Sequence, residues 1–149
     1  MPDAISGAKA PLSFWVISGL SLLWNAVGGY DYWMTRTRNL DYLAQAGDPQ
    51  VMLGWVDSFP LWAQVCWGLG VWGSIAGSVL LLLRSRHAVS AFLVSLVAAL
   101  LSFSYQLFIS DVPASLDTTG GKVIPLVILA IVAFLWQFSK REAAKGLLR

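Results

Sequence analysis

Long, uninterrupted apolar runs dominate the hydrophobic pattern of this chain. Four uncharged stretches cover Leu12–Tyr30, Pro60–Leu83, Ala88–Ser110 and Val123–Ser139. The hydrocarbon core of a bilayer is about 30 Å thick, and a helix needs about 20 apolar residues to cross it. Helix is required because backbone groups in lipid have no water to bond. The pattern therefore predicts four membrane-spanning helices, at about residues 12–33, 60–84, 88–110 and 122–140.

Composition agrees with a membrane protein. Hydrophobic residues make up 57% of the chain and charged residues 12%, whereas soluble domains carry about 25% charged residues. We expect residues 1–149 to form a single all-α membrane domain, a four-transmembrane-helix bundle. A β-barrel is excluded because its strands alternate in polarity over about 10 residues. The first apolar run continues to Tyr30, which favours an uncleaved helix over a signal peptide.

Lysine and arginine are distributed unequally over the two sides of these spans. If the N-terminus is cytoplasmic, the basic residues inside are Lys9, Arg84, Arg86, Lys140, Arg141, Lys145 and Arg149. Those outside are Arg36, Arg38 and Lys122. Because basic residues concentrate in cytoplasmic loops, we predict that both termini are cytoplasmic. The outer side then carries the acidic residues Asp31, Asp41, Asp48, Asp57, Asp111 and Asp117.

The outer loop between the first two spans, residues 34–59, is the only long connection and contains helix signals. Asn39 could cap one short helix, and Asp48-Pro49 supplies a second cap with proline at the first helical position. The following segment places four apolar residues on one face, namely Met52, Trp55, Val56 and Phe59. We predict a short amphipathic helix that lies flat on the outer membrane surface or caps the bundle.

The other two connections are short. Arg84–His87 predicts a tight basic turn that makes the second and third helices antiparallel neighbours. Asp111–Lys122 predicts a short outer loop, with Pro113 and Gly120-Gly121 as helix breakers.

Small and polar residues inside the spans indicate how the helices pack, because close approach and hydrogen bonds hold helices together in lipid. The candidate packing glycines are Gly28, Gly29, Gly73 and Gly77. The candidate polar contacts are Asn25, Gln64, Gln106 and Ser102. These stripes favour ordinary helix packing, and the alternative is a polar pocket between the first three helices.

Asn25 stands near the middle of the first span, where an unpaired amide would cost about 1–3 kcal/mol. Gln64, Gln106 or a serine hydroxyl could pair with it. Asp31 and Asp111 are candidate outer-facing acids, for which Arg36, Arg38 or Lys122 would serve as partners. A proton or cation site at either acid would be shallow and outer-facing, and one acid would have to lie below the headgroups.

Residues for catalysis or metal binding are scarce. Cys66 is the only cysteine and is expected to be a small buried hydrophobe, and His87 is the only histidine, in a solvated turn. A disulfide, a bis-histidine haem and a zinc site are thereby excluded. Neither a GxSxG, HExxH or P-loop pattern nor a run of like charge occurs. We expect no enzyme, no cofactor, no metal and no nucleic-acid partner.

Two segments carry a resemblance to known proteins. Residues 23–30 read Leu-Trp-Asn-Ala-Val-Gly-Gly-Tyr, and residues 77–86 read Gly-Ser-Val-Leu-Leu-Leu-Leu-Arg-Ser-Arg. The chain resembles, over nearly its whole length, short four-helix bacterial inner-membrane proteins that are sometimes labelled as sugar transporters. The resemblance implies a location in the bacterial inner membrane and carries no site residues.

Three functions remain open on the sequence alone. The leading hypothesis is a non-catalytic protein that acts through helix contacts, as an accessory subunit of a larger complex or as a homo-oligomer. The alternative is a small transporter of an uncharged solute such as a sugar, held by Asn25, Gln64 and Gln106 with Trp24, Trp67 and Trp72. A second alternative is binding of lipid or a quinone between the helices.

Overall fold

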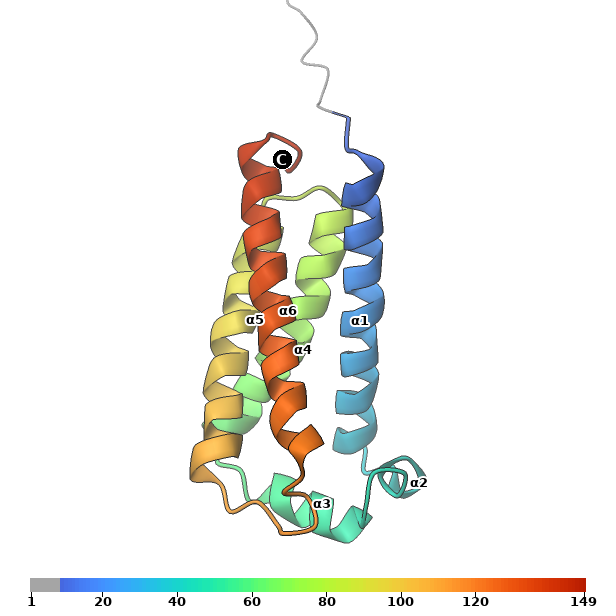
Figure 1. Cartoon of the computed structure of the whole chain (residues 1–149), viewed down its shortest axis with the longest axis vertical. Coiled ribbons are helices and arrows are strands. Elements are labelled where there is room, and N and C mark those ends of the chain that lie inside the picture. Colours follow the sequence, from blue (N-terminus) through green and yellow to red (C-terminus); the bar gives the residue numbers. More distant parts are fainter. Residues whose placement is uncertain (1–8) are drawn as a thin grey trace, which may run out of the picture.

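The computed structural model describes residues 9–149, and the N-terminal residues 1–8 lie outside the described part (Figure 1). Four long helices form the bundle: α1 (Leu12–Arg36), α4 (Leu61–Leu82), α5 (His87–Ser104) and α6 (Thr119–Ala144). A π-helical segment, η1 (Tyr105–Ile109), extends α5. All four helices are long and apolar enough to cross a membrane, which confirms the predicted all-α bundle of four spans.

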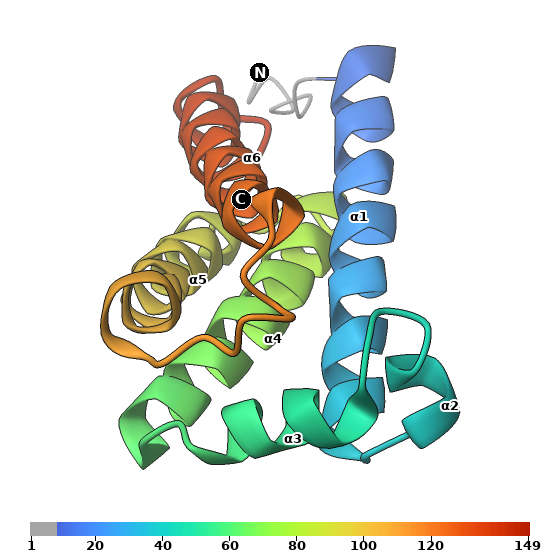
Figure 2. The same cartoon turned by 60° about the horizontal axis from the view of Figure 1, so that its bottom comes forward.

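The four long helices alternate in direction and do not close into a ring. α4 packs against α1 on one side and α5 on the other, and α5 packs against α6, whereas α1 and α6 make little backbone contact. Figure 2 shows the result: α1 stands apart from α6, and α4 lies behind the space between them. The bundle is therefore open along one side.

Glycines allow α4 and α5 to approach closely. A Cβ added at Gly73 would lie 3.1 Å from the Ser95 Cβ, and one at Gly77 would lie 2.8 Å from the Phe92 ring. The predicted GxxxG pair therefore faces α5 directly. Gly70, one turn earlier, meets Ala99 in the same way. Close backbone approach of this kind is how helices gain packing contacts in lipid.

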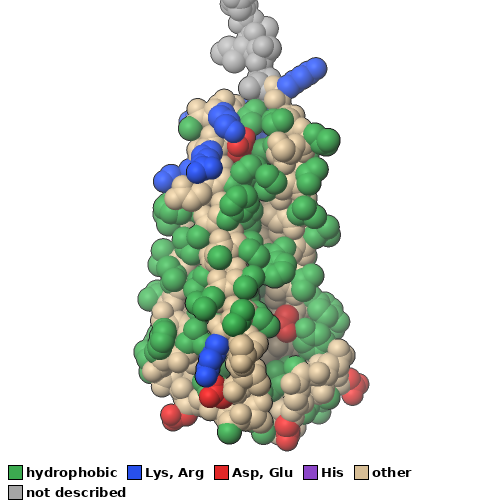
Figure 3. Space-filling model, viewed as in Figure 1, with side chains coloured by type: hydrophobic (Ala, Val, Ile, Leu, Met, Phe, Trp, Pro, Cys, Tyr) green, Lys and Arg blue, Asp and Glu red, His purple; other side chains and the backbone are tan. Residues whose placement is uncertain are grey.

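Charge separates the two ends of the bundle. Figure 3 shows basic side chains at one end and mainly acidic side chains at the other. We call the end with the Arg84–His87 turn and the C-terminus the basic end, and the end with α3 the acidic end; the adjoining halves are the basic half and the acidic half. The side of the membrane on which each end lies stays a prediction.

Large side chains fill the basic half. Its core comprises Phe14, Leu81, Ala88, Phe92, Leu135, Leu147 and Leu148, all at most 4% exposed. The last residues reach this core because α6 ends at Gly146, which has a φ of 76° and so takes the left-handed conformation that glycine adopts freely. The Arg149 N–H then donates to the Arg84 carbonyl at 2.7 Å, and the Arg86 N–H donates to the Arg149 carbonyl at 2.8 Å.

Two short helices form the connection at the acidic end, as the cap signals predict. α2 (Leu40–Leu43) is capped by Asn39, whose side chain accepts from the Tyr42 N–H. α3 (Pro49–Asp57) is capped by Asp48, and Pro49 is its first residue. Figure 1 shows α3 crossing beneath the bundle. Of the two predicted placements, α3 adopts the one that caps the bundle.

The start of α6 corrects one prediction. Gly120 and Gly121 were expected to break the outer loop, but they lie in the first turn of α6. The Thr118 Oγ1 accepts the Gly121 N–H at 3.0 Å, so a threonine cap starts the helix before the glycines. α6 consequently begins earlier than residue 122 and also ends later than residue 140. It is the least buried of the four spans, as its uniform apolar sequence suggests.

Candidate ligand cavity

The acidic half encloses a cavity of about 550 Å³. All four long helices line it, and α3 contributes the side chains of Met52, Trp55 and Val56 at the acidic end. Figure 3 shows that the face between α6 and α1 is hollowed in this half. Because α1 and α6 scarcely touch, the cavity opens sideways, toward the region that lipid would occupy.

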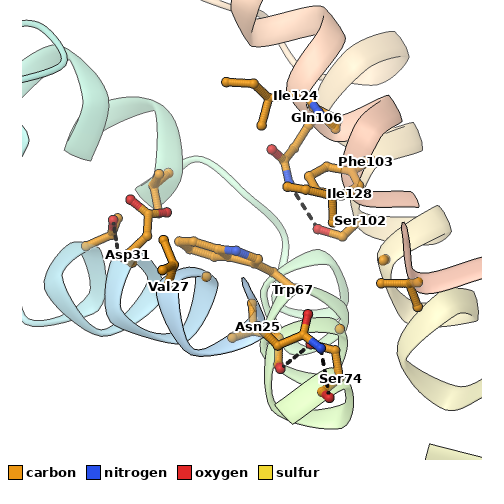
Figure 4. Close-up of a pocket in the computed structure, with 18 of the residues that line it drawn as sticks. Asn25, Val27, Asp31, Trp67, Ser74, Ser102, Phe103, Gln106, Ile124 and Ile128 are labelled. Atoms are coloured by element: carbon orange, nitrogen blue, oxygen red, sulfur yellow. Dashed lines mark hydrogen bonds between the residues drawn. The ribbon is translucent and has the colours of Figure 1, made fainter. Parts of the chain in front are cut away.

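Asn25 lies at the floor of the cavity (Figure 4). Its Nδ2 donates to the Ser74 carbonyl at 3.2 Å and to the Ser78 Oγ at 2.8 Å, both on α4. A carbonyl only accepts hydrogen bonds, so this contact fixes the orientation of the amide. Among residues 9–149, the Asn25 Oδ1 receives no hydrogen bond, although the side chain is 6% exposed. Asn25 thus presents an acceptor to the cavity.

Serines extend this contact toward the basic half. The Ser21 Oγ also donates to the Ser78 Oγ, at 3.1 Å. Ser78 is fully buried and in turn donates to the Ser74 carbonyl. Of the partners suggested for Asn25, a serine hydroxyl is therefore the one that the structure shows.

The two glutamines lie elsewhere. Gln64, near the start of α4, accepts from the Arg36 guanidinium at 3.0 Å and donates to the Phe59 carbonyl. Gln106 does line the cavity, but its Nε2 donates to Ser102 on its own helix, at 3.0 Å. The expectation that either glutamine pairs with Asn25 was wrong, because each lies nearer the acidic end of the bundle.

Asp31 lies in the cavity wall one turn and a half before the end of α1. Its Oδ1 accepts the Tyr42 hydroxyl at 2.8 Å. Burial, the hydrogen bond to Asp31 and the negative charge of Asp31 together raise the pKa of Tyr42 from 10.0 to about 12. The phenol therefore stays protonated and keeps donating to the carboxylate at neutral pH.

The basic residues proposed as partners of the two acids are engaged elsewhere. Arg38 forms an ion pair with Asp57 and Lys122 with Asp117, both at 2.8 Å. Arg36 bonds Gln64 instead. The predicted ion pairs of Asp31 were wrong, because α2 folds back and brings Tyr42 to this carboxylate. Asp111 lies beyond the end of η1, outside the cavity wall.

Aromatic side chains form much of the wall. Trp24, Trp55 and Trp67 line the cavity, and in Figure 4 the Trp67 ring lies between α1 and the cavity. Trp67 and Trp72 both pack edge-on against Tyr32, with centroid distances of 4.8 and 6.0 Å. Trp72 does not line the cavity, so only two of the three tryptophans expected at a solute site lie there.

The π-helical turn joins α5 to α3. The Trp55 Nε1 donates to the Ser110 Oγ at 3.2 Å, and Ser110 follows η1 directly. Tyr105, the first residue of η1, packs edge-on against Phe59 at 5.4 Å. π-turns widen a helix locally and are frequent at functional sites. Here the turn fixes α3 over the cavity.

The two adjacent glycines of α1 differ in role. A Cβ added at Gly29 would lie 2.6 Å from the Ile75 side chain of α4, so Gly29 permits packing as predicted. A Cβ at Gly28 would meet nothing within 4 Å, and Gly28 lines the cavity. The prediction that Gly28 packs against a neighbouring helix was wrong, because its open face points into the gap beside α6.

Several cavity residues carried no sequence signal. Tyr42 is one residue of a four-residue helix, and Ile124, Pro125 and Ile128 belong to an apolar helix without polar markers. The raised apolar content of α6 could not show which face meets the gap. The position of Pro125 in the first turns of α6 offered a weak signal of an irregular face.

Other chemistry finds no support among the described residues. Within residues 9–149, no group of three His, Cys, Asp or Glu residues could hold a metal ion. Cys66 is half-buried rather than buried, which corrects the expectation for it. His87 is exposed at the first position of α5.

Comparisons with known proteins leave the cavity as the main functional observation. No protein-family model, curated protein or solved structure matches this chain.

Proposed function

We propose that this integral membrane protein binds a lipid-soluble small molecule, of the lipid or quinone class, in the cavity between α1 and α6. The observation that carries the proposal is the cavity of about 550 Å³, which opens sideways between two helices. Small-molecule sites are typically clefts of about 300–1,000 Å³ with apolar walls and a few placed polar groups. Asn25, Asp31 and Gln106 supply those polar groups here.

The location of the opening favours a ligand that comes from the membrane. The exposed side chains of α1 and α6 on either side of the gap are apolar, including Val27, Leu126 and Val127. A molecule dissolved in lipid reaches such a gap without crossing a polar surface. A sugar, in contrast, would have to leave water and pass beside α3, which covers the acidic end.

Transport of a solute has less support than binding. The cavity ends at Asn25 and Ser74, and the basic half beyond them is filled by the Phe14–Phe92 core. A transport pathway requires a second conformation in which this core opens. The sequence resemblance to proteins labelled as sugar transporters keeps this function as a prediction.

Helix contact with a partner or a second copy also stays a prediction. The small residues that motivated it are used within the chain, since Gly29, Gly73 and Gly77 all pack against neighbouring helices. The charge distribution and the resemblance together support a place in the bacterial inner membrane with both termini in the cytoplasm.

A matched pair of glycine variants tests the proposal. Both Gly28 and Gly19 lie on α1 with open space at the Cβ position, but only Gly28 lines the cavity. Gly28→Leu should fill part of the cavity, whereas Gly19→Leu should leave it empty. The full chain would be titrated in mild detergent with phenylnaphthylamine, an uncharged apolar dye, and the bound dye counted by native mass spectrometry.

We expect one saturable dye site in the wild type and in Gly19→Leu, and a loss of at least about tenfold in affinity in Gly28→Leu. Native mass spectra of freshly extracted protein should also show a retained small molecule in the same two proteins. Equal dye binding by all three proteins, or no saturable binding by any, contradicts the proposed site.

A further inference from the structure

We propose that the cavity selects an amphipathic organic cation, whose positive charge lies beside the Asp31 carboxylate and whose apolar body lies among the aromatic side chains. This inference rests on the proposed function, because it names the ligand class for the same cavity. It goes beyond that function by assigning a charge preference, which neither a lipid nor a quinone as a class requires.

The charge of the wall is the first argument. Asp31 is the only charged residue that lines the cavity, and neither lysine, arginine nor histidine does so. The basic residues of the acidic end are engaged elsewhere: Arg36 with Gln64, Arg38 with Asp57 and Lys122 with Asp117. A phosphate or carboxylate headgroup would therefore meet a negative wall without a counter-charge. An ammonium or another organic cation would supply the missing one.

The hydrogen bonding of Asp31 is the second argument. One oxygen, Oδ1, accepts the Tyr42 hydroxyl at 2.8 Å, which holds the carboxylate in the wall. Among residues 9–149, neither a hydrogen bond nor an ion pair reaches the other oxygen, Oδ2. Asp31 is thus positioned by Tyr42 and still has an acceptor free for a ligand.

The aromatic wall is the third argument. Trp24, Trp55 and Trp67 line the same cavity as Asp31. The faces of tryptophan rings attract organic cations, most strongly where water is excluded. Flat apolar surfaces of this kind also accommodate the hydrocarbon part of an amphipathic molecule. Figure 4 shows Asp31 and Trp67 on either side of Val27, so charge and ring lie within one binding region.

Asn25 supplies an independent polar observation at the floor. Its Oδ1 has no hydrogen-bond partner among the described residues, and its side chain is 6% exposed. Because Nδ2 is used by α4, the atom left for a ligand is an acceptor. On the α1 side the cavity therefore offers acceptors to a ligand, and it fits a molecule with N–H or O–H donors.

Two ions of the same shape and opposite charge test the inference. Tetraphenylphosphonium and tetraphenylborate would be equilibrated with the full chain in nanodiscs of phosphatidylcholine, with empty nanodiscs subtracted. We expect saturable binding of the cation at least about tenfold tighter than any saturable binding of the anion. Asp31→Asn should weaken cation binding by about tenfold and leave phenylnaphthylamine binding within about twofold of the wild type.

Two control variants separate charge from local structure. Asp41→Asn removes an exposed acid of the same end that does not line the cavity. Tyr42→Phe removes the hydrogen bond to Asp31 but keeps its charge. Both should retain cation binding within about threefold, because each leaves the carboxylate in the cavity.

The outcomes distinguish this inference from the proposed function. If cation and anion bind equally, or if Asp31→Asn behaves like Asp41→Asn while the dye still binds, the charge preference is wrong and the cavity site stands. If Tyr42→Phe loses as much as Asp31→Asn, local structure rather than charge explains the loss and the inference also fails. If neither the ions nor the dye bind, both proposals fail together.

Discussion

The basic half and the acidic half of the bundle are built from the same four helices, yet one is filled and the other encloses a cavity. In the basic half Phe14 of α1 stacks near Phe138 of α6, with a ring-centroid distance of 6.1 Å. The C-terminal Leu147 and Leu148 fill the remaining space. In the acidic half Gly28 and Ile124 face the gap instead, and the structure places nothing between them.

The contrast shows that the size of side chains on the two outer helices decides where this fold encloses space. α4 and α5 stay close along their length, through Gly70, Gly73 and Gly77. What varies is the filling between α1 and α6. Since lipid is as apolar as these side chains, the filled half gains stability mainly through packing contacts, while the open half keeps a binding surface.

Removing one phenyl ring from each half of α5 should give the largest difference. Phe92 is 0% exposed in the basic half, whereas Phe103 lines the cavity. Phe92→Ala leaves a new void, and we expect a loss of about 2–3 kcal/mol in unfolding free energy, below the usual cost in water because the transfer term is small in lipid. Phe103→Ala should cost less than about 1 kcal/mol, because that ring already borders empty space.

Reversible unfolding in mixed micelles, followed by circular dichroism, measures both variants under the same conditions. Because the two side chains are identical and share one helix, helix propensity cancels in the comparison. Equal losses for the two variants would mean that the halves do not differ in packing.

Adding a methyl group should change stability in opposite directions in the two halves. A Cβ at Gly77 would lie 2.8 Å from the Phe92 ring, so Gly77→Ala forces a shift and should destabilise by about 1–3 kcal/mol. A Cβ at Gly28 meets nothing within 4 Å, so Gly28→Ala should be neutral or stabilise by up to about 1 kcal/mol through helix propensity. The same unfolding assay reports both values, and destabilisation by Gly28→Ala would show that the acidic half is filled.

Local signals in the sequence account for most of the fold. The four apolar runs predicted the spans, and Asn39 and Asp48-Pro49 predicted α2 and α3, because a cap acts on residues within one turn. The apolar stripe of α3 also identified the face that covers the cavity. The error at the start of α6 is local as well, since two glycines outweighed the Thr118 cap in the prediction.

The candidate site could be predicted only in part, because its contacts join distant residues. Asn25 was recognised from its type and depth, but its partner Ser78 lies 53 positions away. Asp31 was recognised as an outer-facing acid, but its partner Tyr42 reaches it only because α2 folds back. The cavity itself follows from the separation of α1 and α6, the first and last helices, which the sequence pattern of neither helix states.

The boundary between the halves depends on the Asn25–Ser78 hydrogen bond at 2.8 Å. A double-mutant cycle with Asn25→Ala and Ser78→Ala should give a coupling energy of about 0.6–1.7 kcal/mol, the range for interhelical bonds in membranes. Asn25→Ala with Ser102→Ala, a pair with no hydrogen bond between the two side chains, serves as the control cycle. Zero coupling in the first cycle would mean that α1 is held to α4 by packing alone.

Titration of Tyr42 should give the smallest effect, confined to alkaline pH. Its pKa is raised from 10.0 to about 12 by burial and by Asp31, so the folded state favours the neutral phenol. The resulting stabilisation is fully present below pH 10 and is lost as the pH rises toward about 12. Phenolate absorbance of the wild type minus that of Tyr42→Phe isolates this residue among the four tyrosines. In Asp31→Asn the Tyr42 pKa should fall toward 10.0, because both the carboxylate charge and its hydrogen bond are weakened. An unchanged Tyr42 pKa in that variant would show that burial alone raises it, and that Asp31 faces away from α2.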